Sequence, residues 1–181
     1  MKKVFLILSI CLLFTGCTLN KRNAIYKLEK RTNPYENRIE MSFGTFSIPS
    51  TWVKREDHST SSKYFFANKN DSKSIPNNIS VEMGTNHYSI DDHMSFKTAI
   101  QNQLAYQVKS SGATINGSGT TTKNGYVVYT FRVDMGSQIT VQHYIVGDYK
   151  YVLVHETIWD GDSSDTDYAA KEIVNSFKWK N

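Results

Sequence analysis

The stretch that decides the fold is 125–159, which reads GYVVYTFRVDMGSQITVQHYIVGDYKYVLVHETIW. It predicts three successive strands, because apolar and polar residues alternate with the period of two that a strand with one buried face shows. In the first strand the apolar positions are Val127, Tyr129, Phe131 and Val133. In the second strand they are Ile139, Val141, His143 and Ile145. We therefore expect an antiparallel meander at the centre of the domain.

The same alternation predicts the register of the first hairpin. Opposing Val133 to Ile139 and Phe131 to Val141 places the apolar residues of both strands on one face of the sheet. The connection is then a three-residue loop, 135–137, which contains a glycine. The other, wetter face of the sheet would then carry polar and amphipathic side chains of a kind that suits contact with another protein. We call this group the candidate partner-binding face; it consists of Arg132, Thr140, Gln142 and Tyr144. That a helix or water covers this face is an open alternative.

The second hairpin turns at Gly147-Asp148, and its register stays open. In one register the apolar face gains Tyr151, Leu153 and His155. In the other it gains Val152, Val154 and Ile158, together with Glu156. The pattern alone does not choose between them.

The N-terminus predicts export and lipid attachment. Lys2 and Lys3 precede an apolar run of 11 residues, 4–14. A membrane-spanning helix needs about 20 such residues, whereas a run of this length is typical of a secretory signal peptide. The sequence LFTGC at 13–17 resembles a bacterial lipobox, although Phe14 stands where leucine is most common. We expect cleavage between Gly16 and Cys17 and acylation of Cys17; the alternative is an ordinary signal peptide with an incidental cysteine.

These features divide the chain into a signal peptide (1–16), a lipidated cysteine with a flexible basic tether (17–37) and one domain (38–181). Cys11 lies in the removed segment, so Cys17 is the only cysteine of the mature chain and no internal disulfide is expected. Acyl chains such as palmitate would hold the protein on a membrane that faces the periplasm or the exterior. The tether either lies against anionic head groups or acts as a solvated spacer.

Composition excludes one class of partner. Without Lys2 and Lys3 there remain 19 basic and 17 acidic residues, a formal charge of +2, which is no electrostatic footprint for nucleic acid. The 11 Tyr and 9 Phe supply enough apolar surface for a core without metals or disulfides.

Further elements complete the domain. Strands are predicted near 39–43, 46–49, 64–66 and 79–83, and a weak strand over 113–123 leads into a two-residue turn at Asn124-Gly125. A helix should begin at Ser89 with a capping box to Asp92, run to Ser110 and stop at Gly112. A second helix covers 168–177.

The order of elements, with the segment Ile48-Pro49-x-x-Trp52 and the final Ile173-Val174-Asn175-Ser176-Phe177-Lys178, resembles the PsbP/Mog1/DcrB superfamily. That resemblance covers most of 39–179. It implies an α+β fold with a central antiparallel sheet of about six or seven strands flanked by helices. It also implies a binding or assembly factor, with no catalytic residues to carry over.

Motifs for chemistry are sparse. The five histidines, His58, His87, His93, His143 and His155, lack the spacing of a zinc site, although His87 and His93 could reach one ion with Asp91 and Asp92. The acidic run 160–167 departs from a calcium loop, since Asp165 replaces the turn glycine and Lys171 the final glutamate. No nucleophile elbow or phosphate-binding glycine motif occurs.

We therefore predict a non-enzymatic, lipid-anchored envelope protein without a cofactor, whose domain binds another protein as an assembly factor or as an immunity protein against a secreted toxin. The alternative is an envelope lipoprotein that binds a small ligand or a metal.

Overall fold

The computed structural model describes residues 36–159 and 161–180. The predictions for the signal peptide, for Cys17 and for nearly all of the tether lie outside these residues. Within them, no helix is both long and apolar enough to cross a membrane. The first strand begins at Glu36, inside the stretch assigned to the tether.

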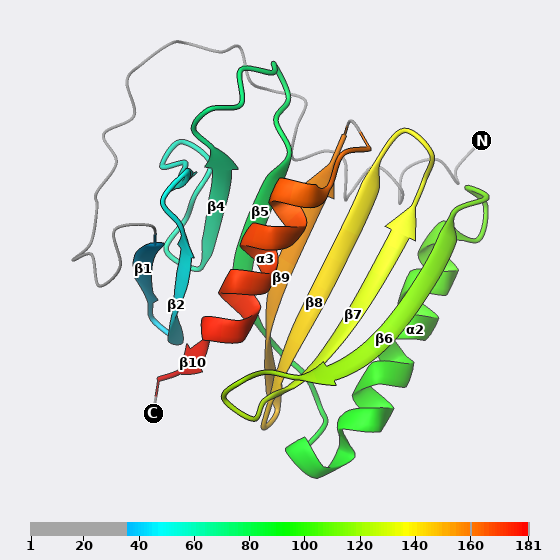
Figure 1. Cartoon of the computed structure of the whole chain (residues 1–181). Helices are drawn as coiled ribbons and strands as arrows, with labels where there is room; N and C mark the ends of the chain where they lie inside the picture. The colour runs from blue at the N-terminus through cyan, green and yellow to red at the C-terminus, as the bar shows by residue number, and fades with distance from the viewer. Residues whose placement is uncertain (1–35, 160, 181) are drawn as a thin grey trace.

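Ten strands, a short 3-10 helix and two α-helices follow one another along this part of the chain (Figure 1). A three-stranded sheet has the order β1-β2-β10, and a seven-stranded sheet has the order β3-β4-β5-β9-β8-β7-β6. Every pairing is antiparallel. The elements are β1 (Glu36–Met41), β2 (Gly44–Pro49), β3 (Trp52–Lys54), β4 (Lys63–Asn68), β5 (Asn78–Thr85), η1 (Ile90–Asp92), α2 (His93–Val108), β6 (Thr114–Thr121), β7 (Val127–Asp134), β8 (Ile139–Gly147), β9 (Lys150–Ile158), α3 (Ser164–Ser176) and β10 (Lys178–Trp179). The predicted α+β fold is confirmed.

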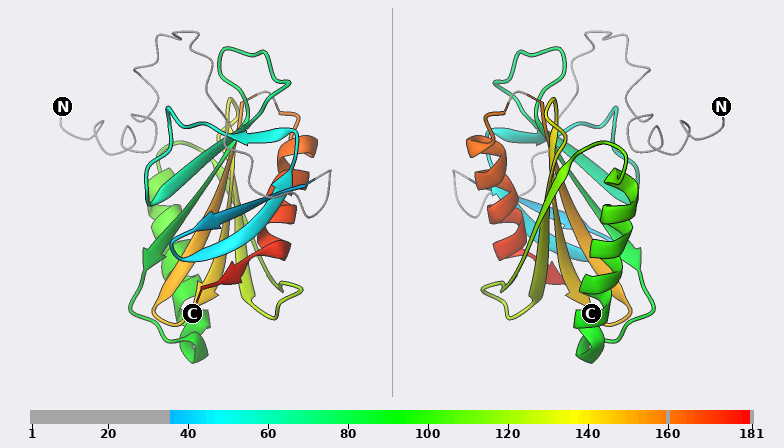
Figure 2. Two further views of the ribbon diagram at one scale, coloured as in Figure 1. Left: turned by 90° about the vertical axis from the view of Figure 1, so that its left-hand side faces the viewer. Right: turned by 90° about the vertical axis from the view of Figure 1, so that its right-hand side faces the viewer.

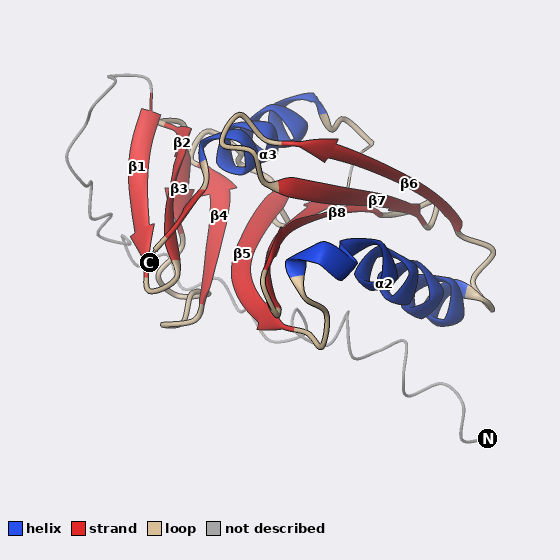
Figure 3. Cartoon of the chain, turned by 90° about the horizontal axis from the view of Figure 1, so that it is seen from below, coloured by secondary structure: helices blue, strands red, loops and turns tan. Residues whose placement is uncertain are grey.

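The large sheet separates two hydrophobic cores. Figure 2 shows α2 and α3 on opposite faces of it, and Figure 3 shows β1 and β2 at the side of the sheet, near α3. On the α3 side, Ile173 and Phe177 pack with Val154 and with Phe46 of β2. On the α2 side, Phe96 and Leu104 pack with aromatic residues of β7 and β8. Both faces of the central strands are therefore apolar.

The predicted register of the first hairpin is wrong by one residue. Val133 lies opposite Thr140 and Phe131 lies opposite Gln142. The Met135 N–H donates to the Gln138 carbonyl, which leaves a two-residue turn at Gly136-Ser137 in which Gly136 has a φ of 80°. The shift sends the apolar positions of β7 toward α2 and those of β8 toward α3. Alternation did not fix the register because β8 is a central strand covered on both sides.

The second hairpin adopts one of the two registers left open. Gly147 pairs with Lys150 and Ile145 with Val152, so that Val152, Val154, Glu156 and Ile158 lie on the α3 side with Val141, His143 and Ile145. The turn consists of Asp148 and Tyr149, and Tyr149 has a φ of 55°.

Several local predictions also need correction. No side-chain cap forms at Ser89 or at Asp92; instead a 3-10 turn leads into α2, which ends at Val108. The turn after β6 has three residues, Lys123 to Gly125, because the Thr122 N–H donates to the Tyr126 carbonyl. The short strands β3 and β10 were not predicted, since two or three residues carry no readable alternation.

Candidate functional site

The four residues of the candidate partner-binding face do not share a face. Arg132 lies opposite Val141, on the α3 side of the sheet, and it is half-buried. Thr140, Gln142 and Tyr144 point to the α2 side, where their exposed fractions are 4%, 9% and 6%. The structure thus places three of the four beneath α2, as a consequence of the one-residue shift in register.

Tyr144 is a core residue. Its ring packs against the rings of Phe96, Phe131 and Tyr151, with centroids between 5.3 and 6.1 Å away. Its hydroxyl donates to Oε1 of Gln142 at 2.6 Å, and burial raises the pKa of the Tyr144 hydroxyl. Gln142 and Tyr144 therefore satisfy each other inside the domain and offer no surface to a partner.

Arg132 instead belongs to a part of the sheet that neither α2 nor α3 covers. Among the described residues, α3 packs against β2, β9 and β5, so β6 and the part of β7 that follows the buried Val128 stay open on that side (Figure 1). We call this region the open sheet face: Asn116, Ser118 and Thr120 of β6 with Thr130 and Arg132 of β7. The three β6 residues are exposed and the two β7 residues are half-buried.

A chain of hydrogen bonds leads from the open sheet face into the core. The Thr130 hydroxyl lies 2.9 Å from Nδ1 of His143, and Nε2 of His143 lies 2.7 Å from Oε1 of Glu156. Neighbouring strands position the three side chains, because Thr130 and His143 are opposite each other, and Glu156 lies opposite Val141, next to His143.

Glu156 is the buried end of this chain, with an exposed fraction of 1%. Burial raises the pKa of its carboxyl, the bond to His143 opposes that rise, and the nearby Asp167 carboxyl adds to it. Its second oxygen, Oε2, is buried without a hydrogen bond among the described residues. Such a carboxyl resists ionisation, since a charge here would be poorly compensated.

Thr130, His143 and Glu156 have the order of a nucleophile, a base and an orienting acid. Covalent catalysis also needs donors aimed at a developing oxyanion. The backbone N–H groups around Thr130 and His143 belong to strands that are paired on both sides. These N–H groups donate to the neighbouring strands, so they cannot form an oxyanion hole. The three side chains form a polar network that runs from the open sheet face into the core, with one buried oxygen of Glu156 left unpaired among the described residues.

Solved structures that resemble this chain include a PsbP and a Mog1 protein. The solution structure of the cyanobacterial PsbP (CyanoP) from Synechocystis sp. PCC 6803 is 13% identical, with a TM-score of 0.54, and the match covers 81% of this chain and 93% of that one. The structure of a point mutant of Mog1 is 11% identical, with a TM-score of 0.50 and coverage of 79% and 95%. This is the PsbP/Mog1-like fold. No protein-family profile matches the sequence, and no curated protein matches it either.

The sequence did not reveal the polar chain of this PsbP/Mog1-like domain. Under the predicted register His143 lies opposite Tyr129, whereas in the structure it lies opposite Thr130. A signal was present in the sequence, because a histidine and a glutamate on neighbouring strands are both expensive to bury alone. This signal indicates a pairing of the two side chains only when the register of β8 against β9 is known.

His93 and Asp162 make local hydrogen bonds. Nδ1 of His93 lies 2.6 Å from the Tyr129 hydroxyl, which ties the start of α2 to β7. In the acidic run, Asp162 accepts bonds from the Ser164 N–H and hydroxyl, which lower the pKa of Asp162. Among residues 36–159 and 161–180, no group of three His, Cys, Asp or Glu side chains is placed to hold a metal ion.

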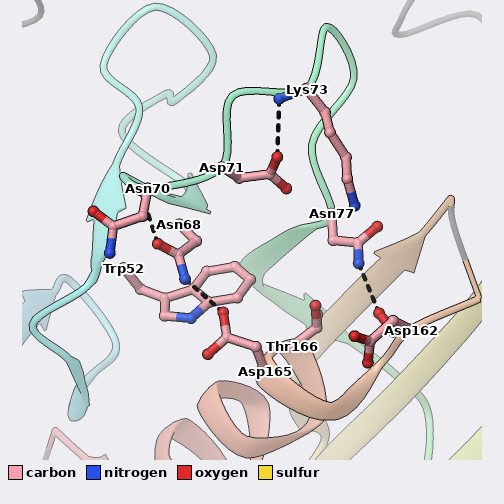
Figure 4. A pocket seen from close by; sticks show the side chains of 9 residues that line it. All are labelled: Trp52, Asn68, Asn70, Asp71, Lys73, Asn77, Asp162, Asp165 and Thr166. Carbon is pink, nitrogen blue, oxygen red and sulfur yellow. Dashed lines mark hydrogen bonds between the residues drawn. The ribbon is translucent and has the colours of Figure 1, made fainter.

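A polar pocket of about 220 Å³ lies between β3, the loop after β4 and the start of α3 (Figure 4). Asn68 donates to the Asp165 carboxylate, and Asn77 donates to the Asp162 carbonyl at 2.9 Å. The indole of Trp52 lies behind them, and its Nε1 is buried without a hydrogen bond among the described residues. The lining residues are Trp52, Asn68, Asn70, Asp71, Lys73, Asn77, Asp162, Asp165 and Thr166.

Proposed function

We propose that this protein is a lipid-anchored envelope protein whose PsbP/Mog1-like domain binds another protein without catalysis, through the open sheet face. The N-terminal signal, with its lipobox-like sequence ending at Cys17, supports the anchor. The observation that carries the binding role is the uncovered part of the sheet around Arg132, in a domain whose other sheet face is closed by α2.

The open sheet face has the properties of a contact surface. Its residues stand on strands within a large sheet, so their positions are fixed before a partner arrives, which lowers the entropic cost of binding. Arg132 supplies a planar donor on a long stem, surrounded by short hydroxyl and amide side chains. A partner with a carboxylate at the matching position could form a bidentate contact with it.

Two roles fit such a tethered binding domain. An assembly factor would hold another envelope protein, and an immunity protein would hold a secreted toxin at the membrane. Both need a rigid surface and an anchor, and neither needs catalytic groups.

The test combines localisation with capture. The full chain, carrying a C-terminal tag, is expressed in its host and compared with Cys17→Ser, which should move from the membrane fraction to the soluble fraction. Proteins that co-purify after crosslinking in intact cells are identified by mass spectrometry. We expect one stoichiometric partner that is lost with Arg132→Glu and retained with Arg38→Glu, a matched exposed arginine on β1. Equal capture by both variants would contradict the proposed surface.

A second candidate function rests on the polar pocket. Amide and carboxylate side chains beside an indole whose Nε1 makes no hydrogen bond among the described residues are suited to a small, neutral, hydroxyl-rich ligand. A screen of such compounds by thermal shift, with Trp52→Phe as the control for indole hydrogen bonding, tests this role. A ligand that stabilises the parent chain and Trp52→Phe equally would exclude a role for Nε1.

A further inference from the structure

The buried carboxyl of Glu156 lies against a second carboxyl, that of Asp167 in the first turn of α3. Burial raises the pKa of Glu156, and the charge of Asp167 and a side-chain hydrogen bond with it raise this pKa further. Glu156 is 1% exposed, and Asp167 is half-buried. Two ionised carboxylates cannot form a hydrogen bond, because each of them only accepts. One of the two must therefore carry a proton.

The oxygen that carries the proton follows from the other hydrogen bonds. Oε1 of Glu156 is occupied by Nε2 of His143. Oδ2 of Asp167 accepts from the Ser163 hydroxyl at 2.8 Å. Oε2 of Glu156 is buried and has no hydrogen-bond donor among the described residues. A proton on Oε2 would give this buried atom a partner, whereas a charge there would lack one.

The charged groups around Glu156 favour a neutral carboxyl at this position. In the described part of the chain, β8 brings His143 to it, and β5 places an apolar residue opposite it. The helix α3 brings Asp167, and Lys171, one turn further on, is exposed. Arg132 of β7 lies two strands away on the same side of the sheet, about 10 Å from Glu156. Ionisation of Glu156 would thus place two like charges in contact.

Asp167 is the ionised partner of the two. It stands in the first turn of α3, where the positive end of the helix stabilises a negative charge. Its bond from Ser163 and its contact with water favour the carboxylate as well. Glu156 is buried and distant from a helix N-terminus, so the proton resides on Glu156.

We propose that Glu156 and Asp167 share one proton at neutral pH, and that its loss to solvent at higher pH frees the first turn of α3 from the sheet. In the protonated state each link of the network has one donor and one acceptor. The Thr130 hydroxyl donates to Nδ1 of His143, and Nε2–H of His143 donates to Oε1 of Glu156. Oε2–H of Glu156 then donates to Asp167. This inference does not depend on the proposed binding of another protein.

Deprotonation would move the start of α3 rather than the sheet. Glu156 cannot turn away, because β9 is paired with β5 on one side and with β8 on the other. Ser164 and Asp165 are exposed, so the first turn of α3 can shift toward water and separate the two charges. Asp165 and Thr166 also line the polar pocket. The same proton would therefore control the shape of that pocket.

The effect of Glu156 on stability has a defined sign. The ordinary pKa of its carboxyl is 4.5, and burial makes the pKa in the folded protein higher. The folded state then holds a proton that the unfolded chain has released. The contribution of this carboxyl to stability is fully present below pH 4.5 and is lost as the pH rises through the raised pKa.

Carboxyl NMR on the parent chain tests the proton directly. The full chain in mild detergent is labelled with carbon-13 at its carboxyl groups and titrated from about pH 4 to about pH 8. We expect Asp167 to be ionised and Glu156 still protonated at about pH 6. Asp167→Asn removes the like charge, so Glu156 should then titrate at a lower pH. A Glu156 carboxyl that is ionised at about pH 6, or one whose titration Asp167→Asn leaves unchanged, would overturn the shared proton.

Hydrogen exchange tests the release of α3. The Asp167 N–H donates to the Ser163 carbonyl at 2.7 Å, so its protection, relative to the intrinsic exchange rate at each pH, reports whether the first turn is closed. In the parent chain we expect this protection to fall about tenfold from about pH 5 to about pH 8. Glu156→Gln should stay protected throughout, because its amide donates to Asp167 and its oxygen accepts from His143 at every pH.

Glu82→Gln is the matched control for the loss of a carboxylate from the sheet. Glu82 of β5 forms an ion pair with Lys63 at 3.3 Å, so its removal should leave the pH dependence of the Asp167 amide as in the parent chain. Constant protection in the parent chain, or an equal fall in Glu156→Gln, would overturn the release of α3. If Glu156→Gln does not fold, the carboxyl titration and the amide protection of the parent chain still decide both parts of the proposal.

Discussion

Nε2 of His143 lies 2.7 Å from Oε1 of Glu156, so a histidine of β8 and a carboxyl of β9 share a hydrogen bond in the core. Thr130 holds the other ring nitrogen of His143. The register of three adjacent strands positions each side chain. Each side chain would destabilise the fold if it lost its hydrogen-bond partner.

The first prediction concerns this pair. His143→Leu should destabilise the domain by about 3 kcal/mol, because the polar Glu156 carboxyl is then left buried without its partner. The double variant His143→Leu/Glu156→Leu should lose clearly less than the sum of the two single variants, since no orphaned polar group remains. Urea unfolding of the four proteins measures the coupling. Additivity within about 0.5 kcal/mol would show that the two side chains do not support each other.

The second prediction concerns pH and His155, whose pKa burial lowers to about 4. Its ring is neutral in the folded state and takes up a proton on unfolding below its ordinary pKa of 6.5. Its contribution to stability is therefore complete above pH 6.5 and is lost as the pH falls toward 4, at most about 3 kcal/mol in total.

Unfolding measured across this range should show a smaller loss of stability at low pH in His155→Gln than in the parent chain. His58→Gln serves as the control, because His58 lies in the loop between β3 and β4 rather than in the sheet. Identical pH profiles for the parent chain and His155→Gln would mean that other groups cause the acid sensitivity.

The third prediction concerns Gly44, where β2 meets the end of the chain. A Cβ at this position would lie 2.7 Å from the backbone oxygen of Lys178 and would also meet the buried ring of Phe177. Gly44→Ala should cost about 2–3 kcal/mol, since the backbone of β10 must move. Ser42→Ala, in the same hairpin at an exposed residue, should change stability by less than about 0.5 kcal/mol. Melting temperatures of the two variants, compared with that of the parent chain, measure this difference in stability.

The fourth prediction separates the two sides of the sheet. Tyr144→Ala removes a ring that three other aromatic side chains contact, and we expect a loss of about 4 kcal/mol. Arg132→Glu should cost about 1 kcal/mol or less, because Arg132 lies on the open sheet face. Chemical unfolding of both variants provides the comparison. A large loss with Arg132→Glu would mean that this side chain supports the fold, and it would then be unsuitable as a surface probe.

The sequence predicted the elements better than their arrangement. The alternation in 129–133 correctly separates buried residues from half-buried ones, with Phe131 and Val133 inside and Thr130 and Arg132 facing out, whereas Val127 is half-buried and Val128 is buried. The alternation in β8 gave no such separation, because residues 140–147 are all buried. A strand with both faces covered has no wet face from which its orientation can be read.

The side to which each residue of the candidate site points was likewise only partly predictable from the sequence. Arg132 was assigned to a wetter face and lies on one, whereas Thr140, Gln142 and Tyr144 were assigned to it and lie beneath α2. Their polar atoms allowed either placement. The bond between Tyr144 and Gln142, invisible in the sequence, makes burial acceptable.

The sequence by itself determined the meander and both helices, because these follow from local periodicity and from turn residues such as Gly136 and Gly125, and the class of the fold was implied by the resemblance to the PsbP/Mog1/DcrB superfamily. Only the tertiary structure decided the register of β7 against β8, the joining of Thr130, His143 and Glu156, and the contact of Glu156 with Asp167. These depend on which surface each helix covers, and a contact between segments far apart in the chain has no period to reveal it.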